Sequence, residues 1–123
     1  MAVEAKPFRI SGTGKQVRDL LHISDLCGCF EKIARLPEDS PVWGEAFNTG
    51  GGPETSLSLL ELFGILHGDF GLTVGYTAGP PRLGDQKVFI ADTARAQRLL
   101  GWVPRVGVAQ GLGEIVGTHR SIQ

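Results

Sequence analysis

Residues 8–24, "FRISGTGKQVRDLLHIS", set the fold class of this chain. "FRIS" (8–11) and "VRDLLHIS" (17–24) predict two extended segments on either side of a glycine turn. Ser24 then suits the N-cap of a helix, and Asp25 follows in the first turn, where the helix dipole favours an acid. Pro37 is expected to close this helix. The chain therefore begins strand, turn, strand, helix.

The remainder predicts three more short strands and three more helices. The strands are residues 45–50, 72–77 and 87–91. The first of these helices is expected to start near Ser56 or Ser58, with a possible capping box of Ser58 and Glu61, and to end at a cap at Gly68. The next helix starts at the cap Asp92 and ends at Gly101, with Ala96, Leu99 and Leu100 inward, and the last runs from Val108 to Arg120. We expect one α/β domain, α+β-like, over residues 1–123: a small mixed-strand lobe with three to four helices. The regular β-α-β alternation of a Rossmann nucleotide-binding domain is absent from this pattern.

Length, charge and cysteine content narrow the function classes. The 123 residues carry a formal net charge of -1, so no overall basic field favours nucleic acid or a membrane surface. No apolar run approaches the ~20 residues that span a bilayer, and the N-terminal "MAVEAKPFRI" lacks the apolar segment of a signal peptide. Cys27 and Cys29 are expected to be small apolar residues near a core. We therefore expect a cytoplasmic protein without nucleic-acid or membrane partners.

Two glycine-rich stretches invite a phosphate-binding interpretation. In "GTGKQVRD" (12–19) the P-loop pattern fails, because Arg9 stands where its first glycine belongs and Gln16 where its hydroxyl belongs. In "NTGGGPETS" (48–56) the dinucleotide fingerprint fails, because Thr55 replaces the third glycine. We therefore expect no cofactor-binding residues in this chain.

Arg18 and Arg82 are the candidates for binding phosphate, since each lies beside a glycine or proline turn. Guanidinium binds phosphate oxygens in bidentate geometry and keeps its charge at physiological pH. Asp85 can accept hydrogen bonds from ribose hydroxyls or from a base. Spacing alone favours a structural arrangement instead, in which Arg18 pairs with Asp19 or Asp25 and Arg82 pairs with Asp85.

The sequence assigns no catalytic residue and no metal ligand. It contains no nucleophile-base triad, paired-carboxylate motif or metal-ligand cluster. His22, among the apolar residues of "LLHIS", is expected to be a hydrogen-bonded core histidine in the middle of a strand.

Three motifs carry a resemblance to a known family. They are "GTGKQVRDLLHISDL" (12–26), "GEAFNTGGGPETSLSLLEL" (44–62) and "RLGDQKVFIADTARAQRLLGWVP" (82–104). Together they resemble the C-terminal, substrate-binding part of the extended short-chain dehydrogenase/reductases, the NAD-dependent nucleotide-sugar epimerases and dehydratases. "GKQVRD" and "GDQK" are most similar to the CDP-paratose 2-epimerase (CDP-tyvelose epimerase) group of these isomerases.

The resemblance implies roles for individual residues. Arg18 and Arg82 would hold the diphosphate of a nucleotide sugar, such as a CDP-sugar. Asp85 would contact the nucleoside, and Gln16, with Lys15 beside it, would line the same cleft. Complete family enzymes use NAD and a Tyr-x-x-x-Lys pair. Tyr76 is the only tyrosine in the chain, and no lysine stands four residues after it. The resemblance thus implies a binding lobe that is inactive alone.

Two other functions remain open. The chain can be a stand-alone module that binds nucleotide diphosphates, or an interaction protein that docks to a separate Rossmann-type chain or to a copy of itself. Family lobes pack against their Rossmann domain through apolar surface, and an uncovered apolar surface favours association. We therefore expect a homo-oligomer or a partner chain.

Overall fold

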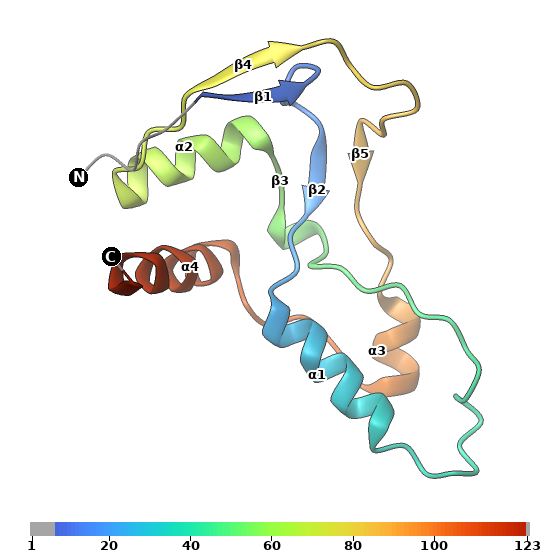
Figure 1. Ribbon diagram of the computed structural model, residues 1–123. Helices are drawn as coiled ribbons and strands as arrows, with labels where there is room; N and C mark the ends of the chain where they lie inside the picture. Colours follow the sequence, from blue (N-terminus) through green and yellow to red (C-terminus); the bar gives the residue numbers. More distant parts are fainter. Residues whose placement is uncertain (1–6, 123) are drawn as a thin grey trace. The chain divides into compact units, whose positions relative to one another are not determined.

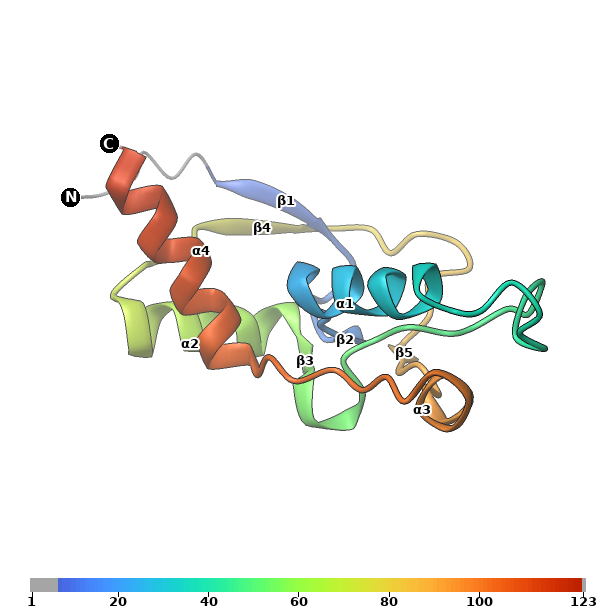
Figure 2. The same ribbon diagram turned by 90° about the horizontal axis from the view of Figure 1, so that it is seen from below.

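A computed structural model gives the fold of residues 7–122 (Figures 1 and 2). The elements in order are β1 (Phe8–Ser11), β2 (Val17–Asp19), α1 (Ile23–Ala34), a 3-10 turn (Pro53–Thr55), β3 (Ser56–Ser58), α2 (Leu59–Phe70), β4 (Tyr76–Gly79), β5 (Val88–Phe89), α3 (Ala94–Leu100) and α4 (Val108–Ile122). The predicted mixture of short strands with three to four helices is confirmed. No helix within residues 7–122 is both long and apolar enough to cross a membrane. Residues 1–6, on which the signal-peptide expectation partly rests, lie outside the described part.

The chain divides into two compact units. Unit 1 comprises the residues up to Arg18, Leu57–Phe89 and the residues from Leu112 onward. Unit 2 comprises Asp19–Ser56 and Ile90–Gly111.

Parallel strand pairs organise unit 1. β1 pairs with β4 in the register Phe8↔Tyr76 to Ser11↔Gly79, and the two strands run side by side in Figure 1. β2 pairs with β5 through Val17↔Val88 and Arg18↔Phe89, in a sheet of order β3-β2-β5. Parallel neighbours need long connections, so each strand meets a partner from far along the chain. This pairing brings the glycine turn after β1 beside the irregular segment between β4 and β5.

Helix α2 follows the predicted capping box. Ser58 Oγ accepts a hydrogen bond from Glu61 N (3.2 Å), and Glu61 Oε2 accepts one from Ser58 N (2.7 Å). Ser58 Oγ also donates to Glu61 Oε2 (2.7 Å). The hydrogen bonds that the Ser58 side chain and backbone donate to this carboxylate lower the pKa of Glu61. The predicted cap at Gly68 is wrong. Gly71, with φ 67°, ends the helix and donates to His67 O (3.1 Å), so the helix runs one turn further.

Unit 2 has a small core between α1 and α3, formed by Cys29, Ala96, Leu100 and Trp102. The buried Asp25 connects α1 to the segment after α3. Its Oδ2 accepts from Arg105 N (3.0 Å) and Val106 N (2.9 Å), and its backbone oxygen accepts from Trp102 Nε1 (2.8 Å). Burial raises the pKa of the Cys29 thiol, as expected of a core cysteine. Cys27, in contrast, is exposed.

Helix α1 begins before the predicted cap. His22, not Ser24, is the N-cap residue, and its Nδ1 accepts from Ser24 N (3.3 Å). The extended segment therefore ends at Asp19, and His22 lies at a helix start rather than in mid-strand. A histidine ring nitrogen can accept from a helix amide much as a serine oxygen does, and the residue pattern did not separate the two.

Two strand predictions and one helix face also needed correction. Residues 45–50 form no strand, because they lead into a glycine turn that packs against its own unit. The predicted 72–77 strand is β4 (Tyr76–Gly79), whose position follows its pairing with β1.

In α3 the N-cap is Thr93, while Asp92 Oδ1 accepts from Ala94 N (3.0 Å). Leu99, expected inward, is 41% exposed.

Candidate functional site

The turn at residues 12–16, "GTGKQ", is shaped by contacts within unit 1. Gly12 and Gly14 have φ values of 77° and 75°, in the left-handed region that glycine enters readily. Gly12 N donates to Gly79 O (3.1 Å), at the end of β4. A Cβ on Gly14 would lie 2.9 Å from Ile10 Cδ1 and 3.1 Å from Leu60 Cδ2. Packing therefore accounts for these glycines without a bound phosphate.

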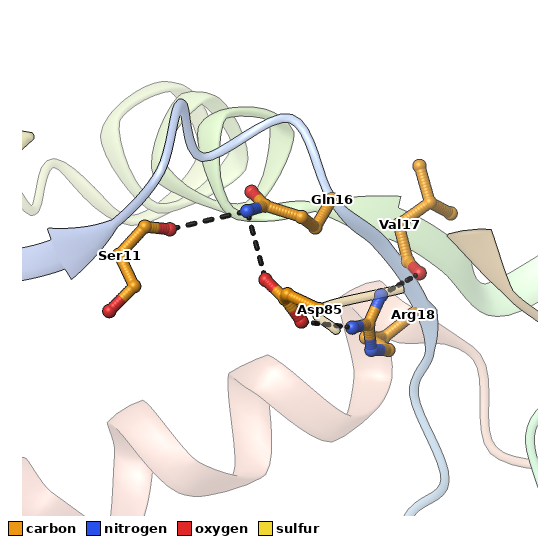
Figure 3. A network of polar contacts seen from close by, with 5 residues as sticks. All are labelled: Ser11, Gln16, Val17, Arg18 and Asp85. Carbon is orange, nitrogen blue, oxygen red and sulfur yellow. Dashed lines mark hydrogen bonds and ion pairs between the residues drawn. The ribbon is translucent and has the colours of Figure 1, made fainter. Parts of the chain in front are cut away.

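Asp85 joins the two predicted motifs in one polar network (Figure 3). Its Oδ2 accepts from Gln16 Nε2 (3.0 Å), and its Oδ1 accepts from Arg18 Nη2 (3.1 Å). Gln16 Nε2 also donates to Ser11 O (3.2 Å), and Arg18 Nη1 to Val17 O (2.8 Å). The Arg18 and Asp85 side chains keep 40% and 28% of their surface exposed. A ligand can therefore reach this pair from solvent.

The structural ion pairs suggested by spacing do not form. Arg18 pairs with Asp85 rather than with Asp19 or Asp25. Arg82 is exposed, and no residue between 7 and 122 pairs with its guanidinium. The guanidinium of Arg82 is thus available to an external anion.

A hollow of about 500 Å³ lies beside this network in unit 1. Its lining residues are Gly12, Thr13, Lys15, Gln16, Ala78, Gly79, Pro81, Arg82, Asp85 and Lys87. It therefore gathers Gln16, Arg82 and Asp85, three of the four predicted site residues. The fourth, Arg18, is reached through its bond to Asp85. The hollow falls in the size range of small-molecule sites, roughly 300–1,000 Å³.

Lys87 is the lining cation that sequence reasoning did not identify. It follows Asp85 by two residues in "GDQK", and its backbone oxygen accepts from Val17 N (2.9 Å), which fixes it next to β2. Lys15, Arg82 and Lys87 thus bring three positive charges to one hollow. Guanidinium and ammonium groups neutralise phosphate oxygens, and a carboxylate such as that of Asp85 accepts from hydroxyl donors.

The second glycine-rich turn, residues 50–52, is occupied by its own unit. A Cβ on Gly50 would overlap the Asp19 carboxylate and Ala91, and one on Gly51 would overlap Leu20 O and Thr55 Oγ1. Gly50 and Gly51 therefore face neighbouring protein atoms, and they do not offer the open backbone that a dinucleotide pyrophosphate requires. Among the residues that the structure describes, no cluster of three or more histidine, cysteine or acidic groups fits a metal ion.

In sequence the chain is similar to nucleotide-sugar epimerases. No protein-family model matches it. A CDP-paratose 2-epimerase from Salmonella typhi is 40% identical over 117 residues, which are 95% of this chain and 34% of that protein. A UDP-glucose 4-epimerase from Mycolicibacterium smegmatis is 34% identical over 92% of this chain and 34% of its own length. The chain thus spans about a third of the length of these curated relatives.

Structure comparison gives the same result. The crystal structure of a UDP-glucuronic acid 4-epimerase from Bacillus cereus, in complex with UDP-glucuronic acid and NAD, matches with a TM-score of 0.84 and 26% identity. The match covers 98% of this chain and 37% of that one. The matched region is the C-terminal lobe of the epimerase fold, as the sequence motifs predicted.

Proposed function

Because this chain is homologous to the C-terminal third of the NAD-dependent nucleotide-sugar epimerases and dehydratases of the extended short-chain dehydrogenase/reductase family, we propose that it is a nucleotide-sugar-binding lobe. In this proposal the hollow of unit 1 takes the nucleoside diphosphate, and the sugar extends from it. The observation that carries the proposal is the Gln16–Asp85–Arg18 network at the edge of a cationic hollow.

Each residue has a role that its chemistry supports. Arg82 has its guanidinium available for the diphosphate, and Arg18 can turn from Asp85 toward a phosphate oxygen because 40% of its side-chain surface is exposed. Asp85 then accepts from ribose hydroxyls. Gln16 Oε1 is buried without a hydrogen-bond partner among the described residues. A buried unpaired acceptor costs about 1–3 kcal/mol, and a ligand donor would remove that cost.

We further propose that residues 1–123 bind substrate and do not transfer hydride. NAD, which the complete relatives use, would be held by protein outside this segment, since Gly50 and Gly51 are filled by their own unit. NAD supplies oxidation and re-reduction of a sugar centre in such isomerases. The contribution of this chain is to fix the nucleotide end. We also propose a cytoplasmic location for this function.

The test is calorimetric titration of the chain with CDP, UDP and dTDP, in parallel with Arg18→Ala and Arg82→Ala. A partly shielded arginine–phosphate contact contributes on the order of 1.5–3 kcal/mol, or about tenfold or more in affinity. Arg98→Ala, on the exposed face of α3 in unit 2, is the matched control and should bind normally. Binding that is equal in all four proteins, or undetectable in the unaltered chain, would refute the proposed function.

A second function, docking, is favoured by exposed apolar side chains in unit 1. Leu83, Val88 and Phe89 are 106%, 60% and 46% exposed. Uncovered apolar side chains of this kind favour association with a Rossmann-type chain or a second copy. Light scattering at rising concentration tests this. A dimer that Leu83→Ser and Phe89→Ser dissociate supports docking, whereas a clean monomer at high concentration counts against self-association.

A further inference from the structure

The hollow of unit 1 carries more positive charge than a nucleotide sugar can neutralise. Asp85 is the single acid among its ten lining residues, and it is already paired with Arg18. Lys15, Arg82 and Lys87 therefore remain, and none of them has an ion-pair partner within residues 7–122. Like charges that line one hollow repel each other, and concave walls strengthen their combined field. Such a cluster is stabilised when an anion binds.

The negative charge of a nucleotide sugar can be compared with the three positive charges of Lys15, Arg82 and Lys87. A diphosphate that is esterified at both ends carries one negative charge on each phosphate, so it leaves one of the three cations unneutralised. Lysine interacts as a compact point charge and does not require the bidentate geometry of a guanidinium clamp. The two lysines are thus suited to an anionic group that lies beyond the diphosphate.

We propose that Lys15 and Lys87 select ligands with an anionic group in addition to the diphosphate. That group can be the carboxylate of an acidic sugar or the third phosphate of a nucleoside triphosphate, which would then compete with the nucleotide sugar. This inference rests on the proposed function, since both ligand types occupy the same hollow. In this inference the two lysines select the substrate, while Arg18 and Arg82 hold the diphosphate that every ligand contains.

Backbone hydrogen bonds hold both lysines in place at the hollow. Lys15 N donates to Thr13 Oγ1 (3.3 Å), and Lys87 O accepts from Val17 N (2.9 Å). Both backbone positions are therefore held at the lining of the hollow. Lys32, on α1 in unit 2, is exposed and outside the hollow. It provides a lysine of equal charge for comparison.

The experiment measures two affinity ratios in magnesium-free buffer. The first compares UDP-glucuronic acid with UDP-glucose, and the second compares UTP with UDP; CTP and CDP are measured in the same way. In the unaltered chain the ligand with the extra anionic group should bind about fivefold more tightly in at least one ratio. The ratio that responds identifies the source of the anionic group. In Lys15→Ala/Lys87→Ala the ratio should fall to about one, and in Lys32→Ala it should stay unchanged. High salt should reduce the ratio, because exposed charges are screened.

The outcomes separate this inference from the proposed function. Nucleotide binding with both ratios near one in the unaltered chain would overturn the inference and leave the proposed function intact. Affinity ratios that stay unchanged in Lys15→Ala/Lys87→Ala would also overturn the inference and leave the proposed function intact. Absence of binding by every nucleotide would overturn both.

Discussion

The carboxylate of Asp19 occupies the space that a side chain at residue 50 would need. A Cβ on Gly50 would overlap Asp19 Oδ2, which also accepts from Gly52 N (3.2 Å) and Ala91 N (3.1 Å). Asp19, the last residue of "GKQVRD", thus holds together the glycine turn and the segment after β5. The glycines that resemble a cofactor turn are required at this place by packing.

Substitution of this glycine should therefore destabilise unit 2. Gly50→Ala is expected to lower the free energy of unfolding by about 1–3 kcal/mol, because the new methyl group has no room. Gly64→Ala is the control: it adds the same methyl group within α2, where nothing lies within 4 Å, and should raise stability by about 0.5–1 kcal/mol. Urea unfolding followed by circular dichroism measures both. Equal effects of the two substitutions would contradict the packing argument.

Asp25 should be a second position of high sensitivity. Asp25→Ala leaves Arg105 N and Val106 N without their shared acceptor. The expected loss is about 2–3 kcal/mol, since buried amides without partners are costly. Asp39→Ala, which removes an exposed acid from the loop after α1, should change stability by less than about 0.5 kcal/mol. Comparable losses in the two variants would show that the Asp25 contacts contribute little.

The capping box of α2 should make stability dependent on acid pH. The pKa of Glu61 is lower in the folded protein than its ordinary value because Ser58 donates to the carboxylate. Its stabilising contribution is therefore complete above the ordinary pKa and is lost as the pH falls through the lower folded value. The difference in unfolding free energy between the unaltered chain and Glu61→Gln should narrow from about pH 6 to about pH 3. A difference that stays constant with pH would contradict the assignment.

Asp85 should oppose binding of simple anions while it favours nucleotides. Asp85→Asn removes the charge that pairs with Arg18, so inorganic pyrophosphate should bind about two- to fivefold more tightly, as expected for a partly exposed ion pair. UDP should bind more weakly, because its ribose loses an acceptor. Asp69→Asn, at an exposed position of α2, should change neither affinity. If both ligands gained affinity in Asp85→Asn, the proposed contact with the nucleoside would be wrong.

Local signals in the sequence predicted the elements that depend on near neighbours. The Ser58–Glu61 capping box and the Gly101 end of α3 need only residues within one turn, and both are present. The predicted strand at 45–50 failed because long-range packing of Gly50 and Gly51 decides that region. The position of β4 follows its pairing with β1, more than sixty residues away. The hydrophobic periodicity of a short stretch of sequence carries no information about either contact.

For the candidate site, too, the sequence predicted what depends on residue type and did not predict what depends on contacts between distant residues. Residue type identified Arg18, Arg82 and Asp85 as binding groups, because their chemistry is local. The partner of Arg18 could not be identified from spacing, since Asp85 lies 67 residues away and meets it only after β2 pairs with β5. The contribution of Lys87 likewise became visible only from the lining of the hollow.

The placement of the aromatic residues gives each compact unit its own optical signal. Both tryptophans, Trp43 and Trp102, belong to unit 2, and Trp102 is only 2% exposed. The single tyrosine, Tyr76, belongs to unit 1, with its ring centroid 5.2 Å from that of Phe63. Tryptophan emission therefore follows the melting of unit 2 alone, and the tyrosine band of the second-derivative absorbance spectrum follows unit 1. Coincident transitions would mean that the two units unfold as one cooperative body, and separate transitions would mean that each unfolds independently.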